Sequence, residues 1–170
     1  ALSATRAAIE EAGLDTSLLQ HDDRLPTGTV EVTLDDDGSP DFTILPGTAY
    51  DNIRYTDKLG NAAESADCFC FGTLAQRERI SRDTLESIID RLPEQAVRVL
   101  DINLRRDCFS RETIASSLAR ANILKLNDSE TAELDRMFSL GTGGIRDFAE
   151  AALAAWDLQC CVVTLGGYGA

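Results

Sequence analysis

The sequence predicts an α/β fold, in which a parallel sheet flanked by helices carries a small antiparallel β lid. From residue 68 onward, short apolar runs alternate with segments of helical period, as in strands joined by crossover helices. Earlier, residues 27–34 and 41–45 alternate apolar and polar side chains around an acidic, glycine-containing turn at residues 35–38, which is typical of an antiparallel hairpin. Polar residues also follow the apolar runs, at the sheet edge where open α/β sheets bind ligands.

The segments around the hairpin are predicted to connect it to the sheet. Residues 2–12 have the pattern of an amphipathic helix, and Gly13 is expected to end it. Residues 50–67 are polar and are expected to form an irregular connection followed by a helix. One face of the hairpin should be covered, because Val30, Val32 and Leu34 all fall on it.

The remainder of the chain is predicted to alternate strands and helices. Strands are expected at residues 68–71, 97–102, 123–126 and 160–165. The residues expected to cap or begin the intervening helices are Ser81, Ser110 and Ser129. A further helix is expected from Ile145 to Trp156, after a glycine-rich turn at residues 141–144. Right-handed crossovers should then place helices over both faces of the sheet.

The composition excludes several classes of partner. Sixteen Lys and Arg against 29 Asp and Glu give a formal charge of −13, which leaves no electrostatic footprint for nucleic acid and is repelled by anionic membranes. No apolar run approaches the roughly 18 residues of a membrane-spanning helix, and the amino terminus lacks a signal pattern. We therefore expect a cytoplasmic protein that binds neither nucleic acid nor membranes.

The cysteines and the single histidine predict no disulfide framework and no zinc site. The five cysteines are odd in number and contain no C-x-x-C pair, so we expect small buried thiols. His21 lies in a polar loop and is expected to face solvent.

The first candidate ligand-binding segment follows the apolar run at residues 97–100, at the carboxyl end of the predicted strand. Strand alternation would put Asp101, Asn103 and Arg105 on one side, and an arginine there can hold a phosphate or carboxylate through two hydrogen bonds. A charged strand end that simply faces solvent explains the same residues, so both interpretations stay open.

The second candidate segment lies where the strand at residues 123–126 meets the next helix. A helix cap with an acidic first turn would account for Asn127 and Glu130, with Asp128 or Ser129 as the capping residue. As a site, Asn127 would meet phosphate oxygens at the helix amino end, and Glu130 would hold Mg²⁺ through water. Lys125 either reaches an edge of the sheet or faces the same crevice.

The third candidate segment is the glycine-rich stretch at residues 165–170. It would let a phosphate or a nucleotide approach the backbone closely, but it matches neither a P-loop nor a dinucleotide fingerprint. A generic turn remains the alternative.

In this order the motifs resemble the ribokinase-like (PfkB) family of carbohydrate kinases, and most closely its fructokinase-type members. The matching segments are residues 26–28 (Pro-Thr-Gly), 71–74 (Phe-Gly-Thr-Leu), 101–105 (Asp-Ile-Asn-Leu-Arg), 124–130 (Leu-Lys-Leu-Asn-Asp-Ser-Glu) and 163–170 (Val-Thr-Leu-Gly-Gly-Tyr-Gly-Ala). The resemblance implies a Rossmann-like three-layer fold with a β lid. It also implies transfer of the γ-phosphoryl group of ATP to a sugar hydroxyl with Mg²⁺ and a monovalent cation.

The resemblance further implies roles for particular residues. Glu130 would act on Mg²⁺ through the N-x-x-E motif, Arg105 would lie between sugar and phosphate, and Thr27 of the lid would cover the sugar. The residues implied to bind ATP are Asn103, Arg105, Asn127, Thr164, Gly166 and Gly169.

These features divide the chain into three expected regions. Residues 1–26 would supply a helix and a connection of the α/β core, residues 27–48 the lid hairpin, and residues 49–170 an α/β nucleotide-binding core that is incomplete at its carboxyl end. A two-stranded hairpin is marginal alone, so we expect the lid to mediate a homodimer as well.

Two motifs of the family are missing from these 170 residues. They are the amino-terminal glycine-rich segment with its sugar-binding Asn and the carboxyl-terminal G-A-G-D motif with its catalytic Asp. We therefore expect no catalytic residue in this chain, a partial segment that is inactive alone. The competing hypothesis is a non-catalytic sugar- or nucleotide-binding α/β module. A glycosyltransferase-like or receiver-like domain agrees less well with the hairpin and the N-x-x-E motif.

Overall fold

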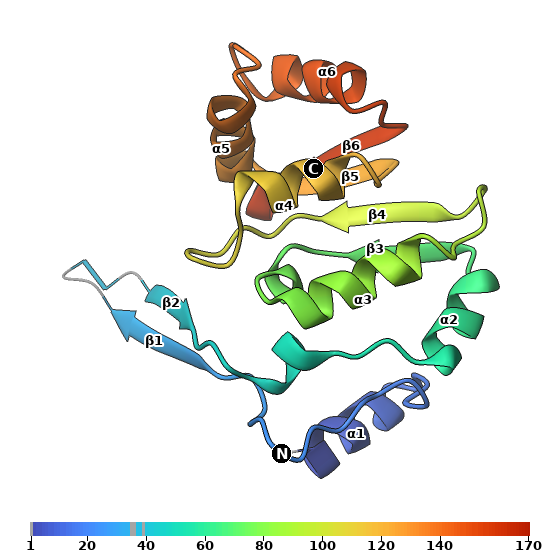
Figure 1. Ribbon diagram of the computed structural model, residues 1–170. Helices are drawn as coiled ribbons and strands as arrows, with labels where there is room; N and C mark the ends of the chain where they lie inside the picture. Colours follow the sequence, from blue (N-terminus) through green and yellow to red (C-terminus); the bar gives the residue numbers. More distant parts are fainter. Residues whose placement is uncertain (1, 35–36, 39) are drawn as a thin grey trace.

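Four short parallel strands form the sheet of the computed structural model, which describes residues 2–34, 37–38 and 40–170. Each of the last three strands pairs with the strand before it in the chain, so the strand order is sequential (Figure 1). The strands are β3 (Cys68–Phe71), β4 (Val97–Asp101), β5 (Ile123–Asn127) and β6 (Cys160–Thr164). Their positions confirm the predicted alternation, and the α/β fold class with a small antiparallel lid is confirmed with them.

Helices join these strands and precede them. The helices are α1 (Leu2–Glu11), α2 (Asp57–Glu64), α3 (Arg79–Ile89), α4 (Arg111–Leu118), α5 (Asp128–Phe138) and α6 (Ile145–Ala155). The short 3₁₀ turns are η1 (Ala49–Asn52), η2 (Leu74–Gln76) and η3 (Gly166–Tyr168). No helix within the described residues is both long and apolar enough to cross a membrane.

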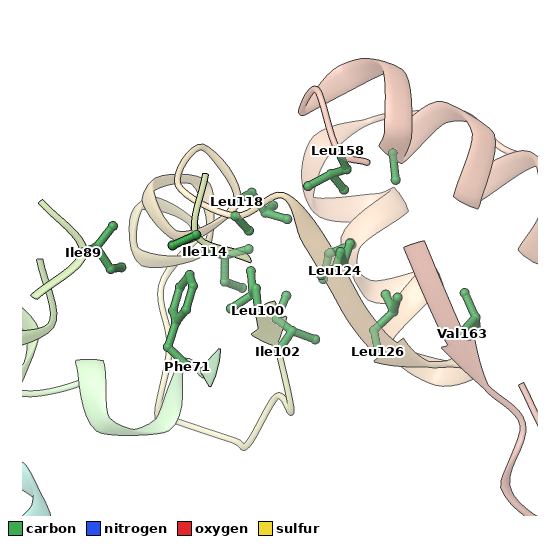
Figure 2. Packing of buried hydrophobic residues seen from close by; sticks show 14 of the residues in the cluster. Phe71, Ile89, Leu100, Ile102, Ile114, Leu118, Leu124, Leu126, Leu158 and Val163 are labelled. Carbon is green, nitrogen blue, oxygen red and sulfur yellow. The ribbon is translucent and has the colours of Figure 1, made fainter. Parts of the chain in front are cut away.

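The hydrophobic core lies between the sheet and the helices on one face. Leu100, Leu124 and Leu126 of the strands are fully buried, and they pack with Ile114 and Leu118 of α4 (Figure 2). Sequential strand order combined with right-handed crossovers puts every connecting helix on the same face. The expectation of helices over both faces therefore holds for one face only in the described part of the chain.

Cysteines lie both on the sheet face that the connecting helices leave open and in buried parts of the fold. Cys68 and Cys70 are exposed on the open face, contrary to the expectation of buried thiols, whereas Cys108 is buried elsewhere in the fold. Burial, with a smaller contribution from Cys160, raises the pKa of the Cys161 thiol to about 11. His21 is exposed as predicted and lies 2.8 Å from the Asp23 carboxylate.

Three serines were predicted to cap or begin helices, and one of them is confirmed as a cap. Ser110 caps α4 by accepting the N–H of Thr113. Ser81 lies inside α3 rather than at its start, because its buried hydroxyl donates to the Tyr50 carbonyl and accepts the N–H of Ile53. At the start of α5, Asn127 is the cap instead of the residues after it, as described below. Gly13, with φ of 74°, ends α1 as predicted.

The lid is the antiparallel hairpin of β1 (Val30–Leu34) and β2 (Pro40–Ile44). Its first strand begins at Val30 and not at Thr27, since the Pro26 carbonyl already accepts the N–H of Ala49 beside the core. Of the predicted turn, Asp35 and Asp36 lie outside the described residues.

The apolar face of the lid is uncovered in this chain. The register pairs Val32 with Phe42 and Val30 with Ile44, so these side chains share one face with Leu34. Val30, Val32, Leu34 and Phe42 are 50%, 55%, 70% and 49% exposed. The expectation of a covered face is therefore wrong for the residues described, and the hairpin stands away from the sheet (Figure 1).

Candidate active site

The predicted residues of the strand ends gather at one edge of the sheet. Parallel pairing places Asn127 of β5 opposite Thr164 of β6, and Asp101 of β4 opposite Lys125 of β5. All three predicted segments therefore begin at the same carboxyl edge, where α/β sheets bind ligands.

The Asp101 side chain faces Lys125 rather than an open crevice. The Lys125 ammonium lies 2.9 and 3.1 Å from the two carboxylate oxygens, and both side chains are about 40% exposed. This ion pair explains the lysine within an otherwise apolar strand. An exposed pair of this kind contributes little to stability.

The next residue, Ile102, is held by both neighbouring strands. Its N–H donates to the Lys125 carbonyl at 3.0 Å, and its carbonyl accepts the Thr73 hydroxyl at 2.8 Å. A Cβ on Gly72 would lie only 2.8 Å from the Asp101 carbonyl oxygen, so glycine is needed for this close approach. In the sequence, Gly72 and Thr73 were noted only as part of a family motif, and no role was predicted for either residue.

Strand alternation stops before Asn103. Asn103 has φ of 39°, in the left-handed region, and β4 has already ended at Asp101. Asn103 is exposed, whereas Arg105 is partly buried and its Nη1 donates to the Leu104 carbonyl at 3.2 Å. The prediction that alternation puts Asp101, Asn103 and Arg105 on one side is therefore wrong.

Asn127 and Glu130 form a reciprocal capping box at the start of α5. The Asn127 Oδ1 accepts the Glu130 N–H at 2.9 Å, and the Glu130 Oε2 accepts the Asn127 N–H at 2.8 Å. The Asn127 Oδ1 also accepts the Ser129 hydroxyl. The capping alternative thus describes the local structure. The Asn127 amide NH₂ donates to no residue in the described part of the chain, and its binding of phosphate oxygens stays a prediction.

Glu130 makes a second contact that reaches beyond the cap. Its Oε1 accepts the Leu104 N–H at 2.7 Å, although only 6% of the residue is exposed. Both carboxylate oxygens are therefore occupied by backbone donors, and each keeps one further lone pair. Binding of Mg²⁺ through water stays a prediction.

The third segment is an open glycine turn beside the end of β5. The Thr164 hydroxyl donates to the Leu126 carbonyl at 3.3 Å. Gly166 and Gly169 have φ of 60° and 100°, values that glycine adopts readily, and the Leu165 N–H donates to the Gly169 carbonyl at 2.7 Å. The turn is exposed to solvent and can be approached closely by a ligand.

Thr27 is not brought to the strand ends. It is exposed and lies at the base of the lid beside a cavity of about 500 Å³, whose walls include Leu18, Tyr50 and Leu74. A separate cleft of about 380 Å³ lies between Phe42 and Ile44 of the lid and residues 106–108 of the loop after β4. No group of His, Cys, Asp and Glu side chains in the described residues could hold a metal ion by itself.

A buried ion pair attaches the lid to the core, and sequence reasoning missed it. The Arg77 guanidinium forms two hydrogen bonds of 2.7 and 2.8 Å with the Asp51 carboxylate, and the two side chains are 9% and 4% exposed. Arg77 also donates to the carbonyls of Ile44 and Leu45 at the end of the lid, and it lies over the Tyr50 ring. We call this pair the Arg77–Asp51 clamp.

The clamp keeps both of its partners charged. Burial by itself would raise the pKa of Asp51, but the hydrogen bonds from Arg77 and Thr48 outweigh it and lower this pKa below its usual value. The same hydrogen bonds to Asp51 raise the pKa of Arg77. Because the pair spans 26 residues of sequence, no local pattern could have revealed it.

The sequence matches a known protein family over nearly the whole chain. The model of the pfkB family carbohydrate kinases matches residues 3–170. The Pyrococcus horikoshii protein named "Putative sugar kinase PH1459" is 26% identical over 133 residues, which are 75% of this chain and 43% of that protein.

Solved structures share the fold at low identity. The structure of PH1459, described as an uncharacterized sugar kinase, gives a TM-score of 0.73 at 21% identity, covering 98% of this chain and 54% of that chain. Fructokinase from Vibrio cholerae O395 gives 0.70 at 20% identity, over 96% and 56%. Fructokinase from Xylella fastidiosa gives 0.74 at 17% identity, over 94% and 53%.

The relatives are longer than this chain and have been solved with ligands. The chain spans about half the length of the proteins that it matches. PH1459 was solved in complex with ATP, and a double mutant of the Vibrio cholerae fructokinase with fructose, ADP and a potassium ion.

Proposed function

The chain belongs to the pfkB family of carbohydrate kinases. From this premise we propose that the intact protein transfers the γ-phosphoryl group of ATP to a sugar hydroxyl. Fructose is the first candidate for that sugar. The observation that carries this proposal is the pairing of Asn127 with Thr164 at the carboxyl edge. It sets the capped amino end of α5 beside the open glycine turn at residues 166–169. Helix amino ends and glycine turns both offer backbone N–H groups to phosphate oxygens.

The nucleotide would be held mainly by neutral donors. The amide NH₂ of Asn127 and the backbone of Gly166 and Gly169 line the edge, and the Thr164 hydroxyl beside them would have to leave the Leu126 carbonyl to donate to the nucleotide. Neutral donors of this kind suit a polyanion in a chain of formal charge −13. Mg²⁺ would neutralise part of the charge on the transferring phosphates. The residue that fits it is Glu130, whose remaining lone pairs could accept hydrogen bonds from water bound to the ion.

The sugar is proposed to bind between the lid and the loop after β4. Arg105 lies in the loop just after Ile102, whose backbone is held by Thr73 and by the Lys125 carbonyl. The cleft beside residues 106–108 is walled by lid residues. Thr27 lies at the base of the same lid and is proposed to approach the sugar when the lid covers it. No residue of this chain is proposed as the catalytic base.

The test is turnover by the intact protein, with Arg105→Lys as the informative variant. We expect ADP release that depends on both fructose and Mg·ATP in the wild type. Lysine keeps the charge but loses the two-pronged hydrogen-bonding geometry, so kcat should fall about 10- to 100-fold while the KM for the sugar changes less. A coupled ADP assay with a panel of sugars measures both.

Arg98→Lys is the matched control for this experiment. Arg98 lies near the amino end of β4, the strand that precedes the loop of Arg105, and donates there to the Pro93 carbonyl, so the turnover of this variant should match the wild type. Equal losses in the two variants would contradict a phosphate-side role for Arg105. ADP release without any sugar dependence in the wild type would favour the non-catalytic binding module instead.

We also propose that the lid joins two copies of the protein. Among the side chains that the structure describes, five apolar ones share its uncovered face, namely those of Val30, Val32, Leu34, Phe42 and Ile44. A two-stranded hairpin is marginal alone. The same apolar face on a second copy can pack against it, and a twofold dimer is formed by such contact between identical faces.

Val32→Asp should therefore weaken the dimer. Burying a valine stabilises an interface by about 1.5–3 kcal/mol, and a charge at the centre of the face should raise the dimer dissociation constant at least about tenfold. Light scattering at several protein concentrations measures the shift toward monomer. Thr33→Lys places a charge on the other face, opposite Asp41 of β2, where opposite charges are favourable, and should leave the mass unchanged. An unchanged mass for Val32→Asp would contradict the dimer.

A further inference from the structure

Glu130 connects two segments that belong to different strand ends. Its Oε2 accepts the N–H of Asn127 at 2.8 Å, and its Oε1 accepts the N–H of Leu104 at 2.7 Å, from 26 residues earlier in the chain. A capping box requires only the first of these bonds. The second bond ties the loop after β4 to the amino end of α5.

The loop that Glu130 holds has an unusual backbone. Asn103 adopts φ of 39°, in the left-handed region, which costs free energy in residues other than glycine, although less in Asn than in most. Upstream, Ile102 is fixed by Thr73 and by the Lys125 carbonyl. Downstream, the bond from Leu104 to Glu130 closes the other side of Asn103, so this residue is restrained from both sides.

We propose that Glu130 is a positioning residue that fixes the loop of Asn103, Leu104 and Arg105 relative to the nucleotide edge, and that it does so without a metal ion. This inference rests on the proposed function in one respect, which is that the loop serves the sugar. The physical basis is the carboxylate itself. It accepts from two N–H donors at once, whereas a carboxamide presents one acceptor and one donor group, so one of the two N–H groups would face a donor and lose its bond.

The coupling makes one side chain serve both halves of the proposed site. When Glu130 holds both bonds, the loop and the cap of α5 keep a fixed separation. When the Leu104 bond is lost, the loop that carries Asn103 and Arg105 is free to leave its strained conformation, while the sheet stays intact because Ile102 remains bonded to β5.

The experiment uses the intact protein in EDTA, without nucleotide. Hydrogen exchange should rise about tenfold at the amide of Leu104 in Glu130→Gln, and fructose binding measured by calorimetry should weaken by about the same factor. Exchange at the amide of Leu124, in the centre of the sheet, should stay at its wild-type rate and so excludes global unfolding as the cause.

Two further variants make the result specific. Glu133→Gln is the matched control and should behave as the wild type. Glu133 lies on the same helix and, among the described residues, pairs only with Arg136 at the surface. Glu130→Asp keeps the charge but is shorter, so it should retain the cap on Asn127 and still release Leu104. It also provides the measurement if Glu130→Gln does not fold.

The outcomes separate positioning from a purely metal-linked role. Wild-type exchange at Leu104 and wild-type fructose binding in EDTA, with a defect only when Mg·ATP is added, would overturn the proposal. Faster exchange at Leu104 in a protein that neither binds nor phosphorylates any sugar would support the positioning of the loop and would remove the proposed function instead.

Discussion

Replacing Arg77 by leucine lowers the free energy of unfolding by about 3–5 kcal/mol, because it leaves a buried carboxylate without its partner. Asp51 is 4% exposed on its side chain and takes two of its hydrogen bonds from Arg77. The same substitution removes the donors to the carbonyls of Ile44 and Leu45. Urea denaturation followed by circular dichroism measures the change.

Two controls isolate the buried charge as the cause. Arg79→Leu removes a surface arginine that pairs with Asp83 while 84% exposed, and it should cost less than about 1 kcal/mol. Adding Asp51→Leu to Arg77→Leu should restore part of the lost stability, since no uncompensated charge remains. Similar losses for the Arg77 and Arg79 variants would contradict the clamp.

Gly72→Ala should have the second largest effect, on both stability and turnover. A Cβ there would lie 2.8 Å from the Asp101 carbonyl oxygen, which is backbone and cannot turn away as a side chain would. The ends of β3 and β4 must then separate, at a cost of about 1–3 kcal/mol. Since the loop with Asn103 and Arg105 follows directly, a shift of about 1 Å should lower kcat/KM about 100-fold.

Gly167→Ala is the stability control for this prediction. No atom of the described residues lies within 4 Å of a Cβ at Gly167, so the melting temperature of this variant should match the wild type. A Gly72→Ala protein with wild-type stability and turnover would show that the two strand ends separate without consequence.

The sequence predicted the arrangement of elements well because that arrangement depends on local patterns. Continuous apolar runs located all four strands of the sheet, and Ser110 and Gly13 located the ends of two helices. The positions of Asn127 and Glu130 at a strand-to-helix junction were also predictable, because a capping box is contained in four consecutive residues.

The errors arose where the backbone or a distant residue decides the result. Alternation was extended from Asp101 to Arg105, but the left-handed conformation of Asn103 breaks the period and is set by contacts from other strands. Ser81 has the residue type of a helix cap, yet its hydroxyl is used by the segment at residues 50–53. The Arg77–Asp51 clamp and the bond from Leu104 to Glu130 each join residues 26 positions apart, beyond the reach of any local motif.

The sequential order of the sheet has a consequence for how the chain folds during synthesis. Because β4, β5 and β6 each pair with the strand made just before, every new strand and helix can dock on an edge that is already complete. Only short loops need to close at each step, which favours rapid folding. The polypeptide can therefore bury its apolar residues in stages as it leaves the ribosome, amino-terminal unit first, and does not need to wait for a distant strand.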